Sequence, residues 1–296
     1  MDIYYIDRVT KEKKREQVPS TKLLNWLYYS KPGTKTLNMV VKRKWASTIY
    51  GLIQSLPMSR YKISAFVNQY GIDLSEAIDS DPKSYRNFNQ FFTRKLKSNA
   101  RPICQERDAI ISPVDGKIMA YTDIDINKVI QVKGFYFTLA ELINDDKKAQ
   151  EYLGGLCLVF RLSPADYHWF HFFDWGEVTS HRKIKGSYYS VNPVALSRVS
   201  NLYCKNKRQV THFLSENFGE TTIVEVGATC VGSIIQTFDN NKVTRGEEKG
   251  YFKFGGSTVI LFIKKDQAVI DDDIIENSNN QLETSVMLGE KIGRKI

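Results

Sequence analysis

The chain has 296 residues, of which 42% are hydrophobic and 25% are charged, a balance typical of a globular protein that can fill a core without disulfides. The charged, apolar-poor start of the sequence argues against a secretory signal peptide, and no stretch approaches the roughly 18 to 20 apolar residues that a membrane-spanning helix needs. The net charge of +9 lies entirely in residues 1–70, which hold 13 Lys or Arg and 4 Asp or Glu, and this asymmetry points to an anionic partner, either nucleic acid or a membrane surface.

Residues 1–70 are basic and aromatic, and we expect amphipathic helices there. Apolar residues recur at steps of three or four, which is the spacing of one helix face; they are Leu37, Val41, Trp45, Ile49, Leu52 and Leu56. Basic residues crowd the first turns of this stripe, and an apolar cluster around Trp26 precedes it. Two explanations stay open: the stripe lies in a lipid interface, or it packs on the rest of the protein and its charges are simply solvated.

The next segment, from Gly71 to about Pro102, has helical spacing. Asp73 and Glu76 fit a capping box that opens a short helix. A further helical stripe follows, formed by Tyr85, Phe88, Phe92 and Leu96.

Residues 103–296 alternate short apolar runs with turns, a pattern that indicates strands. The run from Thr258 to Ile263 is apolar and β-branched, so it predicts a buried strand, and the segment 138–150 predicts a helix. The expected fold class is α+β: N-terminal amphipathic helices (1–70) followed by a mainly antiparallel β sandwich or barrel-like core (71–296).

Neither a disulfide framework nor a metal site is expected. The four cysteines are far apart and form no C-x-x-C pair, so reduced thiols are the simpler interpretation; they are Cys104, Cys157, Cys204 and Cys230. His168 and His171 form an H-x-x-H pair, but no carboxylate or cysteine completes a recognisable ligand set around them.

Three segments carry residues that could do chemistry, and each also has an ordinary structural explanation. Asp115 lies in a Pro-Val-Asp-Gly turn, where Asp-Gly is common turn chemistry. His168 and His171 lie in an aromatic segment, where a histidine pair is more often structural than catalytic. Ser257 follows Gly255 and Gly256 before the buried strand, so its backbone neighbours can adopt unusual angles. Asp, His and Ser together could form a nucleophilic triad.

The chain resembles the phosphatidylserine decarboxylases from about Phe88 to Ile263. Seven segments occur in the family's order; they are Phe91–Lys97 with Arg101-Pro102, Ser112–Gly116, Val132–Gly134 with Leu139, Ser163–His171, Tyr189–Pro193, Val226–Ser233 and Gly250–Thr258. One segment alone is weak, but seven in order are specific. Residues 1–70 carry no family motif, and Gly255 stands where many bacterial members have leucine.

This resemblance implies a self-processing precursor. Ser257 matches the serine that attacks the carbonyl of Gly256, so that cleavage yields a β chain, 1–256, and an α chain, 257–296, with Ser257 converted to a pyruvoyl group. Asp115 and His171 match the residues that activate this serine. His168 matches a histidine linked to contact with the substrate phosphate and to decarboxylation.

The resemblance also implies the reaction and the partners. The pyruvoyl cofactor would form a Schiff base with phosphatidylserine and release CO₂ and phosphatidylethanolamine, with no metal. The basic residues 1–70 would then dock on an anionic phospholipid membrane, which places the enzyme as a peripheral protein on the cytoplasmic face of the cell membrane. A homodimer is expected, and nucleic acid is not.

Two other functions remain open at this stage. A serine hydrolase could use Ser257, His171 and Asp115 without cutting itself. A nucleic-acid binder could use the basic N-terminal residues, although it would not explain the ordered segments or the neutral remainder of the chain.

Overall fold

One large open sheet organises the chain. The structure is a computed structural model that describes residues 3–17, 21–132, 134–229, 233–255 and 257–296. Over these residues ten strands form the sheet, in the spatial order β13 (Lys242–Val243), β9 (Gly176–Ile184), β10 (Arg208–Ser215), β11 (Gly219–Val226), β15 (Ser257–Ile263), β7 (Leu156–Leu162), β4 (Gly116–Tyr121), β17 (Glu283–Val286), β1 (Tyr4–Ile6) and β2 (Lys13–Arg15). Neighbours run antiparallel except β1 and β17, which are parallel.

The mixed α and β composition and the mainly antiparallel pairing confirm the α+β prediction, but the barrel-like closure is wrong. The sheet ends at β13 on one side and at β2 on the other, and these two strands do not pair within the described residues. Short or charged edge strands resist pairing with the sheet edge of another molecule, so they can stay exposed. β13 has two residues, and β2 is Lys-Lys-Arg, so neither edge needs closure.

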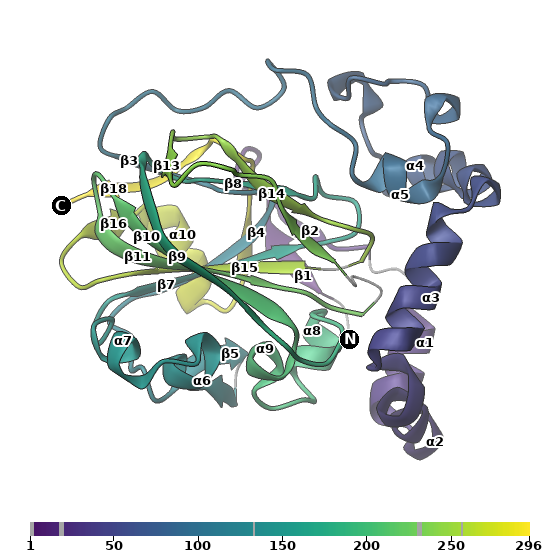
Figure 1. Ribbon diagram of the computed structural model, residues 1–296, viewed down its shortest axis with the longest axis horizontal. Helices are drawn as coiled ribbons and strands as arrows, with labels where there is room; N and C mark the ends of the chain where they lie inside the picture. Colours follow the sequence, from purple (N-terminus) through teal and green to yellow (C-terminus); the bar gives the residue numbers. More distant parts are fainter. Residues whose placement is uncertain (1–2, 18–20, 133, 230–232, 256) are drawn as a thin grey trace.

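Different layers cover the two faces of the sheet (Figure 1). Two three-stranded sheets lie on one face: β12 (Ile234–Gln236), β14 (Glu248–Phe252) and β8 (Trp169–His171), then β16 (Ala268–Ile270), β18 (Lys291–Lys295) and β3 (Ala109–Ile111), together with α10 (Asp272–Asn279). The other face is covered by α6 (Leu139–Ile143), α7 (Asp146–Gln150), α8 (Pro193–Leu196), α9 (Leu202–Lys205) and the hairpin of β5 (Val129–Val132) and β6 (Phe135–Phe137).

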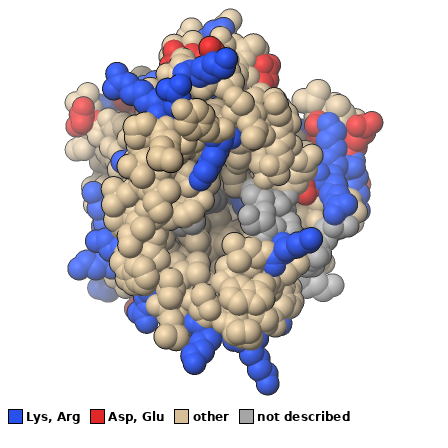
Figure 2. Space-filling view, turned by 90° about the vertical axis from the view of Figure 1, so that its right-hand side faces the viewer, with Lys and Arg blue, Asp and Glu red and all other residues tan. Residues whose placement is uncertain are grey.

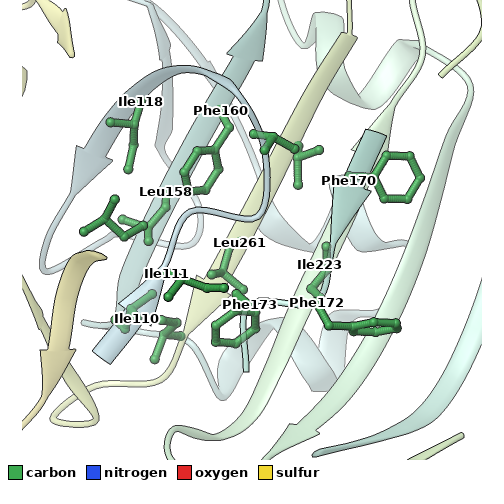
Figure 3. Packing of buried hydrophobic residues seen from close by; sticks show 14 of the residues in the cluster. Ile110, Ile111, Ile118, Leu158, Phe160, Phe170, Phe172, Phe173, Ile223 and Leu261 are labelled. Atoms are coloured by element: carbon green, nitrogen blue, oxygen red, sulfur yellow. The ribbon is translucent and has the colours of Figure 1, made fainter. Parts of the chain in front are cut away.

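β15 is buried on both faces because it lies in the middle of this arrangement. Val259 and Leu261 belong to the core under the small sheets, part of which is shown in Figure 3, whereas Ile260 and Phe262 belong to the core under the helices. A strand covered on both faces has a continuous apolar run, because residues pointing either way avoid water. This confirms the buried strand predicted from Thr258 to Ile263.

Residues 1–70 contain strands as well as helices. β1 and β2 extend the large sheet, with Ile6 opposite Thr284 of β17. The helical part lies at one end of the sheet (Figure 1) and consists of α1 (Thr21–Tyr29), α2 (Lys31–Thr36), a π-helical turn η1 (Leu37–Val41), α3 (Lys44–Ser55), a 3₁₀ turn η2 (Pro57–Lys62) and α4 (Ile63–Tyr70). Two further 3₁₀ turns, η3 (Leu74–Glu76) and η4 (Pro82–Ser84), lead to α5 (Phe88–Phe92).

Several expected helices are shorter than their apolar spacing predicts. The stripe from Leu37 to Leu56 breaks at Lys42, whose carbonyl accepts a hydrogen bond from the backbone of Tyr188. The helix expected over 138–150 divides at Asn144, which adopts a left-handed conformation, and Asp145 caps the second half.

The expected capping box at Asp73 and Glu76 is only half formed. Asp73 accepts from the backbone N–H of Ser75, but the carboxylate of Glu76 pairs with Arg101 at 3.0 Å instead of reaching back to the cap. The segment therefore forms a single 3₁₀ turn.

A buried ion pair joins the large sheet to the small sheet that carries β8. Nζ of Lys249 on β14 lies 2.6 Å from Oε1 of Glu225 on β11, and both side chains are almost completely excluded from solvent. The ammonium also donates to Thr211 and Gln236, so its three N–H groups are satisfied. Burial raises the pKa of Glu225 and lowers that of Lys249, while the attraction between the two opposes both shifts.

Removing the cation alone should destabilise the fold. We expect Lys249→Met to lose about 3–5 kcal/mol of unfolding free energy, because Glu225 would be left as an uncompensated buried charge. Lys249→Met with Glu225→Gln should recover much of the loss. Urea unfolding measures the stability of both variants. It is done in a Ser257→Ala background, because self-cleavage is expected at Ser257 and this change keeps the chain whole. Full stability of Lys249→Met would contradict the role of the pair.

Candidate active site

Ser257 is the first residue of β15, and its side chain is completely buried. Its Oγ has no hydrogen-bond partner among the described residues, which is rare for a buried hydroxyl and marks a candidate reactive group. Gly255 has a φ of 137°, a backbone conformation that residues other than glycine rarely adopt. Gly256, the other half of the predicted cleavage site, lies outside the described residues.

An aromatic cluster holds the segment before Ser257. The ring of Phe254 stacks on Tyr50 of α3, with centroids 5.8 Å apart, and meets the edges or faces of Phe88 and Phe92 of α5 at 5.0 and 4.9 Å. Such contacts fix both the position and the direction of a ring. The turn that leads to Ser257 is therefore anchored on the N-terminal helices.

His168 lies beside this turn as a neutral base. Its ring is fully buried, 4.0 Å from that of Phe92 between centroids, and Nδ1 donates to the carbonyl of Asp166 at 2.8 Å. A carbonyl only accepts, so Nδ1 carries the proton and Nε2 presents a lone pair, for which the described residues provide no donor. Burial lowers the pKa of His168 to about 4, although Asp166 and the backbone of Gly255 oppose the shift.

His171, at the end of β8, has the same arrangement. Nδ1 donates to the carbonyl of Gly246 at 2.9 Å, and Nε2 is buried with no partner in the part of the chain that the structure describes. Burial lowers the pKa of this imidazole, so it is neutral near pH 7. Its backbone N–H donates to Pro113 at 2.9 Å, which places β8 against the turn that contains Asp115.

Asp115 is held by groups other than a histidine. Arg101 binds its carboxylate through two nitrogens at 2.7 to 3.0 Å, and the backbone N–H of Leu288 donates to Oδ1 at 2.8 Å. Asp115 is near enough to His171 for its charge to raise the pKa of the imidazole. Among the described residues, however, no hydrogen bond joins Asp115, His171 and Ser257 to one another. The three predicted residues therefore share one region without forming a linked triad.

The backbone that holds His168 is fixed by a second buried ion pair. Lys117 of β4 lies 3.0 Å from the carboxylate of Asp166, which also accepts from the backbone and hydroxyl of Ser163. Burial by itself would raise the pKa of Asp166, but Lys117 outweighs it and lowers the pKa. The carbonyl that orients His168 belongs to this same Asp166.

Arg94 also belongs to the site, although the sequence motifs assign no role to it. It follows α5, and its side chain is 7% exposed, packed over the ring of Phe91 and near enough to His168 to lower the pKa of that imidazole. A signal was present in the sequence, since Arg94 lies inside the family segment Phe91–Lys97, shortly after two adjacent phenylalanines.

Around the N-terminal helices, Lys and Arg side chains border a surface that has few charged residues (Figure 2). Large apolar side chains are well exposed there; they are Leu23, Trp26, Trp45, Ile49, Leu52, Leu56, Met58 and Tyr61. A group of exposed apolar side chains on one part of a protein surface marks an interaction surface. None of the described helices is both long enough and apolar enough to cross a membrane.

Two neutral imidazoles and a buried hydroxyl can together support proton transfer and nucleophilic attack. Each Nε2 can take a proton, and Oγ of Ser257 can attack a carbonyl once it gives its proton up. Within the described ranges, no group of three or more His, Cys, Asp or Glu side chains is placed to hold a metal ion.

Comparisons with known proteins identify the relatives of this chain. The family model described as phosphatidylserine decarboxylase matches residues 88–294. The chain is 50% identical over 295 residues to the phosphatidylserine decarboxylase proenzyme of Clostridium tetani (strain Massachusetts / E88), with 99% of each chain covered. It is also 50% identical to the protein of that name from Clostridium botulinum (strain 657 / Type Ba4), over 294 residues and 99% of each chain. The identity to the protein of that name from Clostridium perfringens (strain SM101 / Type A) is likewise 50%, over 290 residues and 98% of each chain.

Burial of His168 should make stability depend on pH. Between pH 6.5 and about 4 the unfolded chain binds a proton at this residue that the folded chain does not, so stability falls as the pH falls through this window. We expect His168→Gln to remove up to about 3 kcal/mol of that dependence. Urea unfolding of uncut Ser257→Ala protein at pH 7, 5.5 and 4.5, with and without His168→Gln, measures this pH dependence of stability. Identical pH profiles of the two proteins would contradict the lowered pKa of His168.

Proposed function

The chain belongs to the phosphatidylserine decarboxylase family, and from this premise we propose that it is made as a precursor that cuts itself at Gly256–Ser257 and then decarboxylates phosphatidylserine to phosphatidylethanolamine. The observation that carries the proposal is the buried, unpartnered hydroxyl of Ser257 at the start of the central strand. A structural serine in that place would have a partner.

The self-cleavage begins with proton transfer from Oγ of Ser257 to a neutral imidazole. The oxygen then bonds to the carbonyl carbon of Gly256, the imidazolium returns the proton to the nitrogen of residue 257, and the C–N bond of the peptide breaks, which leaves an ester and a free amine. Loss of the α-proton of residue 257 expels the Gly256 carboxylate, and water replaces the resulting enamine nitrogen, which leaves as ammonia. No external oxidant or metal is needed for this sequence.

Either histidine could serve as the base, and we assign the role to His171. The family resemblance supports His171, and the nearby charge of Asp115 favours the protonated imidazole that forms when the proton is accepted. His168 is closer in the fold to the turn before Ser257, through Phe92 and Phe254. The family resemblance links His168 to contact with the substrate phosphate and to decarboxylation, and we assign it that role.

The surroundings of Ser257 suit a pyruvoyl group at that position. When formed, this group supplies an electron sink for loss of CO₂ from an amino acid headgroup. Residue 257 is enclosed, so water is kept from the reacting atoms, and the Nε2 atoms of the two histidines, which have no hydrogen-bond partner among the described residues, are available to a substrate.

The two products should stay together after cleavage. β15 lies between β7 and β11, and β17 lies between β4 and β1, so these two strands of the short fragment are each paired on both sides with strands of the long one. Arg161 of β7 also binds Glu283 of β17 through Nε at 2.8 Å. The homodimer that the resemblance implies stays a prediction.

The exposed face of the N-terminal helices supports the proposal that the enzyme docks on a membrane. Trp45, Ile49 and Leu52 of α3 are about half exposed or more. Lys and Arg side chains are prominent on the face of the molecule that carries the N-terminal helices (Figure 2). Apolar side chains insert at the headgroup boundary while basic residues attract anionic lipid. Tyr50 of the same helix stacks on Phe254, so a lipid bound at this face lies near the turn that leads to Ser257. We place the enzyme on the cytoplasmic face of the cell membrane.

Self-cleavage is tested by denaturing gel and intact-mass spectrometry. Wild-type protein should give two fragments, of which the shorter is one NH₃ lighter than a chain that begins with serine. Ser257→Ala should give one uncut chain without decarboxylase activity. His171→Gln should slow cleavage, whereas His168→Gln should be cut but decarboxylate poorly. A single uncut wild-type chain that hydrolyses esters would favour a serine hydrolase instead.

Membrane docking is tested with vesicles of anionic or neutral lipid. Leu52→Ser with Leu56→Ser should weaken binding to anionic vesicles at least tenfold, because apolar area is lost. The matched control is Leu153→Ser, since Leu153 is 56% exposed but lies beyond α7 on the body of the protein. High salt should weaken binding of the wild type. Equal binding to neutral and anionic vesicles, or equal losses in the control, would contradict this docking face.

A further inference from the structure

Arg94 carries a buried positive charge for which the described residues provide no counter-ion. Nη2 makes one long contact, 3.4 Å to the carbonyl of Ala165, whereas Nε and Nη1 are buried without any partner. Three N–H donors are therefore unsatisfied. Burial lowers the pKa of the guanidinium, which means that the fold holds this cation at a cost in free energy.

The carboxylates nearest to Arg94 are already engaged. Asp115 and Asp166 both act electrostatically on the guanidinium, but Asp115 is bound by Arg101 and Asp166 by Lys117. Contacts of its neighbours keep Arg94 in place. Trp169 of β8 donates from Nε1 to the carbonyl of Thr93 at 3.1 Å, and Lys95 lies over the Trp169 ring. The segment on either side of Arg94 is thus tied to the strand that carries His171.

A cation that is buried, positioned and unpaired beside His168 is arranged for an anionic ligand. Charge-assisted hydrogen bonds from arginine to phosphate oxygens are among the stronger interactions in proteins, and guanidinium geometry suits phosphate. Resting on the proposed function, we propose that Arg94 binds the phosphodiester group of the lipid substrate and is a substrate-binding residue of the decarboxylase.

The other anion of the headgroup, the carboxylate, fits Arg94 less well. That carboxylate becomes neutral CO₂ in the reaction, so a buried cation bound to it would stabilise the ground state more than the transition state and slow the enzyme. The phosphodiester keeps its charge throughout. Binding it stabilises the ground state and the transition state equally, and loss of such an interaction raises KM while kcat stays unchanged.

The test compares Arg94→Gln and Arg94→Lys with the matched control Arg86→Gln, which removes the same charge from an exposed residue ahead of α5. The substrate is a soluble short-chain phosphatidylserine, and glycerophosphoethanolamine, which has the phosphodiester but no carboxylate, is the inhibitor. We expect Arg94→Gln to be cut normally, to raise KM and the inhibition constant together by roughly 10- to 100-fold, and to leave kcat within about twofold. Arg94→Lys should have a smaller effect, and Arg86→Gln none.

Thermal unfolding distinguishes this role from a structural one. A buried charge without a partner destabilises the fold, so the melting temperature of Arg94→Gln should equal or exceed that of the wild type. A lower melting temperature, or failure to fold, would overturn the proposal. So would a rise in KM without a rise in the inhibition constant, which would assign Arg94 to the carboxylate, or a fall in kcat alone. A wild-type protein that is cut but does not decarboxylate phosphatidylserine would instead refute the proposed function.

Discussion

The position of β15 in the middle of the large sheet is the constraint on which the rest of the structure depends. Its hydrogen bonds to β7 and β11 set Ser257 opposite Leu162, and its two buried faces leave no room for the strand to shift. A shift by one residue would exchange the residues that face the two cores, so the register is strongly specified. The reactive position is therefore fixed by the same packing that holds the fold together.

Exclusion of water determines the chemistry around that position. Burial keeps both histidines neutral, and hydrogen bonds from their Nδ1 atoms to backbone carbonyls leave each Nε2 as the basic atom. The same burial makes the unpartnered atoms of Ser257 and Arg94 energetically unfavourable in the absence of a ligand. Proteins accept such local costs mainly at functional sites.

The N-terminal helices connect the protein surface to this enclosed site. One side of α3 exposes Trp45 and Leu52, and Tyr50 of the same helix stacks on Phe254 three residues before Ser257. Phe254 in turn packs against Phe92, whose ring contacts that of His168 in a tilted arrangement. A short chain of aromatic contacts thus runs from the exposed face to the imidazole, so the part of the chain without family motifs is structurally part of the site.

The sequence alone determined the α+β class, the buried strand after Ser257 and, through seven ordered segments, the family. These are properties of local pattern and of order along the chain, which a sequence contains directly. It could not determine whether the sheet closes, since closure depends on which strands become edges, nor where helices end, since Lys42 and Asn144 break them through contacts and backbone angles that apolar spacing does not encode. Only the tertiary structure decided that Asp115 pairs with Arg101 and that Arg94 has no counter-ion, because ion pairing depends on distances between residues far apart in the chain.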